Sequence, residues 1–240
     1  MPYSLDQVLI VMPAKNEEAV VGNTVAEVKN VLPEATVLVI SDGSTDRTAE
    51  RARTAGADVL ELPINLGVGG AMRLGFRYAH LHGFPVMVQL DSDGQHNPAN
   101  VPGLVNLLDA ANVAIGARFA GVGEYKVRGP RMWAMRALST TLSLATGTRL
   151  TDTTSGFKAH DSTAISLYKD DFPAEYLGDT IEALVIGHRG GLKFTQLAVE
   201  MRERAGGVPS QNAWKSTKYL GRAFAALGLA LIRPGAKNSR

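Results

Sequence analysis

The chain of 240 residues contains no cysteine and no long apolar segment. Without cysteine it can form no disulfide, no thiolate zinc site and no cysteine nucleophile. Its longest uncharged apolar run, Ala223 to Ile232, has ten residues, whereas a helix needs about 20 to span a bilayer. The N-terminal residues also lack the basic start and the apolar stretch of a secretory signal. These absences predict a cytoplasmic protein without a membrane-spanning helix.

The chain also has little net charge, but that charge is unevenly distributed. Its 25 basic and 23 acidic side chains give a formal net charge of +2, which indicates no nucleic-acid partner. Residues 201–240, however, carry eight basic residues and one acidic residue, against 17 and 22 in residues 1–200. A basic end of this kind can face phosphate groups or lipid head groups.

The first half of the chain alternates short apolar runs, rich in β-branched residues, with longer segments of helical period. This alternation indicates βαβ units, and so a Rossmann-like α/β fold with a mostly parallel sheet flanked by helices. The expected strands are residues 8–12, 36–41, 59–62, 86–90 and 113–116. The expected helices are residues 17–31, 46–55, 69–82 and 98–110, the last beginning at an Asn97-Pro98 cap.

The second half loses this rhythm after residue 116. We expect a basic, glycine-containing loop over 118–131, helices over 132–146 and 179–188, and a strand over 192–199. The usual length of globular helices predicts a last helix of about 20 residues from Asn212. The chain is therefore expected to form one α/β domain, residues 1–210, followed by a basic amphipathic helix and tail, residues 211–240.

Polar residues follow the first four expected strands. They occupy residues 13–18, 42–46, 65–70 and 91–96. Each segment also has a simpler interpretation. Residues 42–44 are typical of a turn, and Asp46 is typical of a helix cap. Residues 65–70 are typical of an ordinary loop, since they match no known phosphate-binding pattern. Ligands of open parallel sheets bind at the carboxyl ends of the strands, so the joint placement of these segments favours a binding site.

Asp91 and Asp93 give the strongest local signal, because they follow the apolar run VMVQL. Two carboxylates so close at a strand end repel each other unless a cation lies between them. Oxygen ligands favour Mg²⁺ or Mn²⁺, and Gln95 can add a neutral oxygen. In isolation an Asp-x-Asp sequence is more often a solvated loop; at this edge of the sheet we expect a metal site.

Several motifs together resemble glycosyltransferase family 2, the inverting enzymes of GT-A fold. They are PAKNEE, ISDGSTDRT, NLGVGGAMRLGF, QLDSDGQHNP, AIGARF and DTTSGFKA, in this order from about Val8 to Phe157. Within the family the chain is most similar to the polyprenyl-phosphate sugar synthases, such as the dolichyl-phosphate mannose synthases. The resemblance implies a metal-dependent transfer of sugar from a UDP- or GDP-sugar donor.

The resemblance assigns roles to individual residues. Asp42 matches an acid that holds the nucleotide base, and Asp91, Asp93 and Gln95 match the family's DxDxQ metal ligands, with Asp93 central to catalysis. The metal bridges the donor's diphosphate and stabilises the leaving nucleoside diphosphate. The other expected donor-binding residues are Pro13, Ala14, Asn16, Glu17, Gly70 and Ser92.

The chain departs from the family pattern at four points. Ser41 stands where an Asp is usual, and Val68 where a Lys is common. The terminal Arg-x-x-Gly-x-Ser-Lys pattern is present from Arg204 without its Lys, for which Lys215 or Lys218 is the candidate substitute. The membrane helices that follow the catalytic domain in some relatives are not found in the sequence.

Two acceptors remain open. Arg118 and Arg131 match residues that hold the acceptor phosphate in the polyprenyl-phosphate branch, and the planar guanidinium group suits phosphate oxygens. A hydroxyl acceptor would instead need a general base. Asp179, in a stretch that resembles the family's Glu-Asp-Thr, is the candidate; its alternative role is an acid at a helix N-terminus. The basic run around Arg131 also reads as a solvated face.

The expected C-terminal helix is amphipathic. Leu220, Phe224, Leu227 and Leu231 share one stripe, opposite Lys215, Lys218 and Arg222. This pattern fits either a helix that lies on anionic lipid at the inner face of the membrane, or one that packs on the core with a solvated basic face.

Other classes fit less well. A nucleotidyltransferase should have a glycine-rich, arginine-containing loop after the first strand, and a dinucleotide oxidoreductase a GxGxxG sequence. A carbohydrate-binding module does not require the pair Asp91 and Asp93, and would show no metal-dependent turnover.

Overall fold

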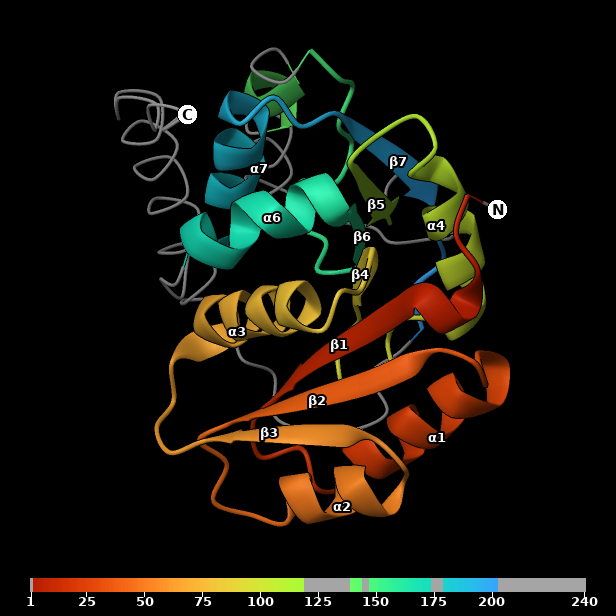
Figure 1. Ribbon diagram of the computed structural model, residues 1–240, viewed down its shortest axis with the longest axis vertical. Helices are drawn as coiled ribbons and strands as arrows, with labels where there is room; N and C mark the ends of the chain where they lie inside the picture. Colours follow the sequence, from red (N-terminus) through yellow and green to blue (C-terminus); the bar gives the residue numbers. More distant parts are fainter. Residues whose placement is uncertain (1, 119–138, 144–146, 174–178, 203–240) are drawn as a thin grey trace, which may run out of the picture.

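A computed structural model describes residues 2–118, 139–143, 147–173 and 179–202. These residues form a single α/β unit (Figure 1). The strands are β1 Val8–Ala14, β2 Thr36–Asp42, β3 Asp58–Leu62, β4 Val86–Gln89, β5 Val113–Ala117, β6 Lys158–Asp161 and β7 Phe194–Ala198. The α-helices are α1 Val21–Val31, α2 Thr48–Thr54, α3 Gly67–Leu81, α4 Val101–Leu107, α6 Ser162–Asp171 and α7 Asp179–Arg189.

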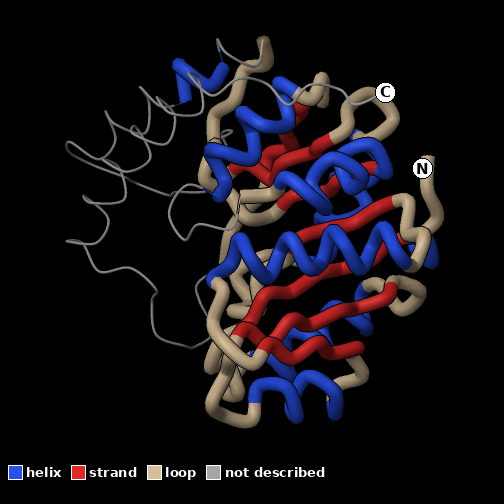
Figure 2. Tube along the Cα trace, turned by 60° about the vertical axis from the view of Figure 1, so that its left-hand side comes forward, coloured by secondary structure: helices blue, strands red, loops and turns tan. Residues whose placement is uncertain are grey.

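The sheet has the strand order β3-β2-β1-β4-β6-β5-β7, and every pair in it is parallel except the two pairs that involve β6. Helices cover both of its faces (Figure 2). The expected α/β fold with a mostly parallel sheet is thus confirmed.

The central strands are buried on both faces, which explains their continuous apolar sequences. Along β1, Leu9 and Val11 face the core under α3, α6 and α7. Val8 and Ile10 face the second core, under α1, α2 and α4. Because side chains alternate along a strand, each central strand contributes to both cores.

Two elements of the rear half were not indicated by the sequence. Strand β6 has the sequence KAHD, whose charged residues are untypical of a buried strand, yet all four of its residues are buried between β4 and β5. Helix α6 follows directly, and the Asp161 carboxylate caps it by accepting a hydrogen bond from the Ala164 amide at 2.8 Å.

Most helix boundaries differ from expectation by a few residues. Helix α1 begins at Val21 instead of residue 17, because the preceding residues form a turn that hydrogen-bonds to the loop after β2. The Asn97 cap is confirmed, but a short 3₁₀ turn over Pro98–Asn100 precedes α4.

The rest of the expected C-terminal architecture lies mostly outside the described residues. Of the expected helix 132–146, residues 139–143 are described and are helical. The basic loop around Arg131 and the tail from residue 203 fall outside. Among the helices that the structure describes, none is long and apolar enough to cross a bilayer.

Candidate functional site

The loops after β1 and β2 are joined by hydrogen bonds at the carboxyl edge of the sheet. Asn16 adopts a left-handed conformation, with φ of 52°. Its amide donates to Ser44 Oγ at 3.1 Å, and its Oδ1 accepts from the Thr45 amide at 2.9 Å. The Glu17 amide donates to Thr48 Oγ1 at 2.8 Å. These contacts compensate for the strain at Asn16 and fix the loop that contains two of the expected donor-binding residues.

Asp46 links the same two loops. Its carboxylate accepts hydrogen bonds from the Thr48 amide at 3.0 Å and from the Glu18 amide at 3.2 Å. Partial burial opposes ionisation of Asp46, but the hydrogen bonds from Thr48 and Glu18 outweigh it and hold its pKa below the usual range. Asp46 therefore has a structural role at this edge, as a partner of two backbone amides.

Asp42, at the end of β2, is buried and contacts the start of α3. Its two carboxylate oxygens accept hydrogen bonds from the Leu66 amide at 2.6 Å and the Gly67 amide at 2.8 Å. The negative charge thus lies at the positive end of the helix dipole. The sequence predicted a contact with a nucleotide base, and the structure adds this contact with α3. Gly70, in the first turn of that helix, is buried, and a Cβ atom there would lie 2.5 Å from the Leu66 Cβ.

Gly43 allows the loop after β2 to approach the loop before α3. It has a φ of +63°, and a Cβ atom there would lie 2.6 Å from the Asn65 nitrogen and 2.7 Å from the Ile64 carbonyl carbon. Only glycine fits this conformation and this approach without displacing the backbone.

The loop after β4 contains the expected metal ligands. Ser92 is buried, and its hydroxyl donates to the Pro13 carbonyl at 3.1 Å, which joins this loop to the end of β1. Asp93 is only 5% exposed, and its Oδ1 accepts from the Gln95 amide at 3.0 Å. The Asp91 side chain is 39% exposed. The structure therefore brings together the expected donor-binding segments after β1 and β4.

The segment before β6 packs directly against Asp91. A Cβ atom at Gly156 would lie 3.1 Å and 3.3 Å from the two Asp91 carboxylate oxygens and 3.2 Å from the Gln89 amide nitrogen. A side chain at residue 156 would therefore press on the carboxylate. The Asp91 carboxylate is therefore confined where it faces Gly156, while the rest of the side chain remains exposed to solvent.

These residues fit a magnesium or manganese ion. Among the described residues no group of three or more His, Cys, Asp or Glu side chains is arranged to hold a metal by itself. Mg²⁺ and Mn²⁺ need no such group when a phosphorylated ligand is present, because they bind through one or two carboxylates together with phosphate oxygens and water. Asp91, Asp93 and Gln95 could supply the protein's share of such a site.

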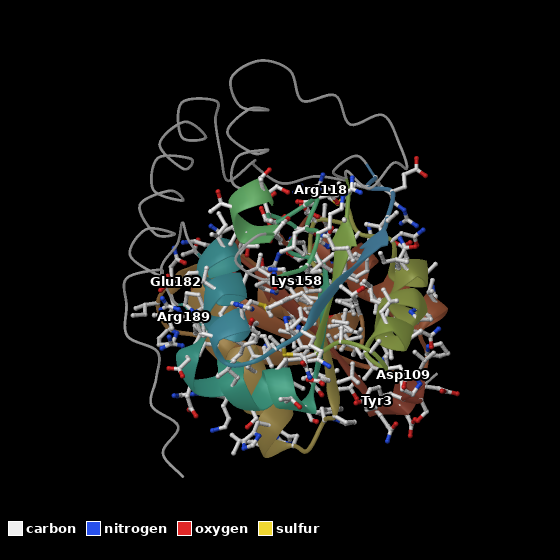
Figure 3. All side chains as sticks on the ribbon, turned by 90° about the horizontal axis from the view of Figure 1, so that it is seen from above. Tyr3, Asp109, Arg118, Lys158, Glu182 and Arg189 are labelled. Carbon is white, nitrogen blue, oxygen red and sulfur yellow. The ribbon has the colours of Figure 1, made fainter. Side chains whose placement is uncertain are left out.

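Arg118 follows β5 and is labelled in Figure 3; it forms an ion pair with the fully buried carboxylate of Asp152. Its Nε donates to Asp152 Oδ2 at 2.6 Å, and its Nη2 donates to Oδ1 at 3.1 Å and to Thr154 Oγ1 at 2.7 Å. Burial alone would raise the pKa of Asp152, but the hydrogen bonds and charge of Arg118 lower it below its usual range. The sequence indicated Arg118 but not its carboxylate partner.

The other two residues expected on the acceptor side are Arg131 and Asp179. Arg131 lies outside the described residues. Asp179 is the first residue of α7, the position of a helix N-terminal acid; a role as general base stays a prediction.

Lys158 on β6 is a buried cation that the sequence did not single out. It is 4% exposed and stands opposite Gln89 in the pairing of β6 with β4. Figure 3 shows it among the packed side chains of the interior. Its place in the DTTSGFKA segment was the only available signal.

His96 was also missed, although it follows Gln95 directly. It is 3% exposed, its ring stacks on Phe157, and its Nδ1 accepts a hydrogen bond from the Asp91 amide at 3.1 Å. A lone buried histidine gives no sign in a sequence of which residue it will contact.

Comparison with known proteins identifies relatives of this chain. The model of the family described as glycosyl transferase family 2 matches residues 9–171. An undecaprenyl-phosphate mannosyltransferase of Micrococcus luteus is 29% identical over 206 residues, covering 82% of this chain and 84% of the relative. A dolichyl-phosphate hexose transferase of Haloferax volcanii is 29% identical over 205 residues, covering 85% and 86%.

The fold is also found among solved structures. Glucosyl-3-phosphoglycerate synthase from Mycobacterium tuberculosis, in complex with Mn²⁺, uridine diphosphate and glucosyl-3-phosphoglycerate, superposes with a TM-score of 0.71 at 23% identity. The match covers 95% of this chain and 81% of that one. The two chains therefore share a fold over nearly the whole of the present protein.

Proposed function

The chain belongs to glycosyl transferase family 2 and is a glycosyltransferase, and we propose that it moves a sugar from a UDP- or GDP-sugar onto a polyprenyl phosphate. The observation that carries the donor half of this proposal is the loop after β4, whose Asp91 and Asp93 are fixed beside the end of β1 through Ser92. The named relatives that use undecaprenyl and dolichyl phosphates support the acceptor half.

The donor occupies the edge formed by the loops after β1, β2 and β4. Asp91, Asp93 and Gln95 would hold a Mg²⁺ or Mn²⁺ ion at this edge. When bound, that ion would supply charge to stabilise the leaving nucleoside diphosphate. Pro13, Ala14, Asn16 and Glu17 line the nucleoside, supported by the hydrogen bonds of Asn16 and Glu17 to the loop after β2.

The acceptor phosphate binds on the side of Arg118. A phosphate monoester is already an anion at neutral pH, so it needs positioning and charge balance and no general base. The Asp152 carboxylate orients the Arg118 guanidinium through two hydrogen bonds. Arg131 adds a second guanidinium, and the basic segment 211–240 contacts the anionic lipid in which the acceptor resides.

The test is metal-dependent transfer onto a lipid phosphate. Purified protein is incubated with UDP- and GDP-sugars, undecaprenyl or dolichyl phosphate, and Mn²⁺ or Mg²⁺, and the glycolipid product is separated by thin-layer chromatography. Asp93→Asn keeps the volume but loses the charge, so transfer should fall at least about 100-fold, the scale on which one transition-state electrostatic contact acts.

The matched control is Asp109→Asn, in the exposed turn that follows α4, which should retain full activity. Transfer that persists in EDTA, or in Asp93→Asn at the unmodified rate, would contradict the metal-dependent mechanism. Transfer onto a sugar hydroxyl in place of the lipid phosphate, abolished by Asp179→Asn, would replace the proposed acceptor with the hydroxyl alternative.

A further inference from the structure

His96 contacts Asp91 at two points. Its Nδ1 accepts the Asp91 amide proton at 3.1 Å. Its Nε2 lies 3.8 Å from Asp91 Oδ2. Nδ1 can accept this hydrogen bond only when it carries no proton, which places the ring proton of the neutral imidazole on Nε2. The Nε2–H group is therefore the one nearer to the carboxylate.

The His96 ring cannot turn away from Asp91 easily. Its side chain is 2% exposed. On one side it stacks on Phe157, with ring centroids 4.9 Å apart and an interplanar angle of 14°. Phe157 is itself 1% exposed and belongs to the same segment as Gly156, which confines the Asp91 carboxylate. The segment before β6 thus fixes both the carboxylate and the histidine behind it.

The loop 91–96 is also closed at its other end. The Asp93 carboxylate accepts from the Gln95 amide at 3.0 Å, and the Gln95 carbonyl accepts from the Arg202 amide at 3.0 Å. Asn97 then caps the 3₁₀ turn that follows. His96 completes this arrangement by connecting the last residue of the loop back to the first.

We propose that His96 is a positioning residue for the divalent cation: it fixes the Asp91 backbone through Nδ1 and places its buried ring, on the Nε2 side, next to the Asp91 carboxylate. This rests on the proposed function, in which Asp91 is a metal ligand. Groups that orient a ligand from behind typically change metal affinity about 10- to 100-fold when removed. At 3.8 Å the contact between His96 Nε2 and Asp91 Oδ2 is longer than a hydrogen bond, so the ring limits the space open to the carboxylate without bonding to it.

The test measures Mn²⁺ affinity directly, from the electron paramagnetic resonance signal of free Mn²⁺, with UDP or GDP present. His96→Phe keeps the stacked ring and loses both nitrogens, so we expect Mn²⁺ to bind about 10- to 100-fold more weakly. His96→Asn keeps an acceptor near the Nδ1 position but loses the Nε2–H group, so we expect a smaller loss. In both variants added Mn²⁺ should restore kcat, because the proposed ligands are all still present and only the position of Asp91 has changed.

The matched control is His80→Asn, an exposed histidine in the last turn of α3, which should bind Mn²⁺ like the unmodified protein. Unchanged Mn²⁺ affinity in either folded His96 variant would overturn the positioning role, as would a lower kcat that added Mn²⁺ does not restore. Asp93→Asn separates this failure from failure of the proposed function. If Asp93→Asn also binds Mn²⁺ normally, the metal site itself is wrong.

Discussion

His160 is a single buried residue that makes the stability of the fold depend on pH. It lies on β6 within an aromatic group, with its ring centroid 4.9 Å from that of Phe76 and 5.8 Å from that of Tyr168. Burial, followed by the positive charge of Lys158, lowers the pKa of His160 from 6.5 to about 3. The folded protein therefore keeps this ring neutral over a range in which the unfolded chain protonates it.

This difference predicts a loss of stability in mild acid. Because the pKa of His160 is lower in the folded state, its contribution is fully present above pH 6.5 and is lost as the pH falls from 6.5 towards 3. One extra proton on the unfolded chain lowers the free energy of unfolding by about 1.4 kcal/mol per pH unit. His160→Phe should remove this slope, measured by urea denaturation between pH 7 and pH 5.

The control for this prediction is His80→Phe, because His80 is exposed and its removal should leave the slope unchanged. If the unmodified protein and His160→Phe show parallel stability curves from pH 7 to pH 5, then His160 is not neutral in the folded state.

The residues of the site differ in how far the sequence could indicate them. Asp91 and Asp93 are adjacent to a recognisable strand, so their position at the edge of the sheet was predictable. The partners of Asp42 and Arg118 lie 24 and 34 residues away in sequence. Those contacts depend on how α3 and the segment before β6 pack, and no local pattern contains that information.

At the scale of elements, the loops after β2 and β3 depend on each other. The Asp42 carboxylate binds the first amides of α3, and Gly43 allows the two loops to touch. The loops after β2 and β3, at the carboxyl edge of the sheet, thus form one packed unit.

Replacing Gly43 by Ala should destabilise the fold in two ways, through backbone strain at a positive φ and through collision of the Cβ atom with the loop before α3. A second variant separates the two effects. Gly83 provides the matched control, because its φ is +73° but a Cβ atom there would meet nothing within 4 Å. We expect Gly83→Ala to lower the free energy of unfolding by about 1–2 kcal/mol through backbone strain alone. Gly43→Ala should cost more, by at least about 1 kcal/mol, because backbone atoms must move as well.

The measurement is urea denaturation of both variants, together with the KM for the nucleotide sugar. KM should rise only in Gly43→Ala. Gly83 follows the C-terminal end of α3, whereas the loop that contains Gly43 contacts the N-terminal end of that helix. Equal losses of stability in the two variants would mean that the loops relax without strain, and that their contact is not a tight one.

The front half of the fold was predictable because β1, β2 and β4 are apolar runs that are buried on both faces and separated by helices. The rear half was less predictable for a specific reason. Strand β6 places Lys158 and His160 in the interior, where tertiary packing overrides their low preference for buried strands. Because β6 was not indicated, neither was the antiparallel reversal that it introduces between β4 and β5.

At the scale of the whole molecule, charge is divided between two parts of the chain. The first 200 residues carry 17 basic and 22 acidic side chains, and the last 40 carry eight and one. The acidic part includes the carboxylates proposed to hold the cation, and the basic part includes Arg202, whose amide donates to the Gln95 carbonyl in the loop after β4. Arg202, the last residue that the structure describes, therefore lies beside the loop with the proposed metal ligands.

Vesicle binding tests whether this segment meets a membrane. Each basic residue near an anionic surface contributes about 1 kcal/mol at physiological salt. Replacing Lys215, Lys218 and Arg222 together by Ala should therefore weaken binding to phosphatidylglycerol vesicles by about 3 kcal/mol, roughly 100-fold. Replacing the exposed Arg51 and Arg53 on α2 together with the partly buried Lys29 on α1 removes the same charge elsewhere and should have little effect. Cosedimentation at two salt concentrations makes the comparison, since an electrostatic contact weakens with salt. Equal binding by both triple variants would show that the net charge, and not this segment, attracts the lipid.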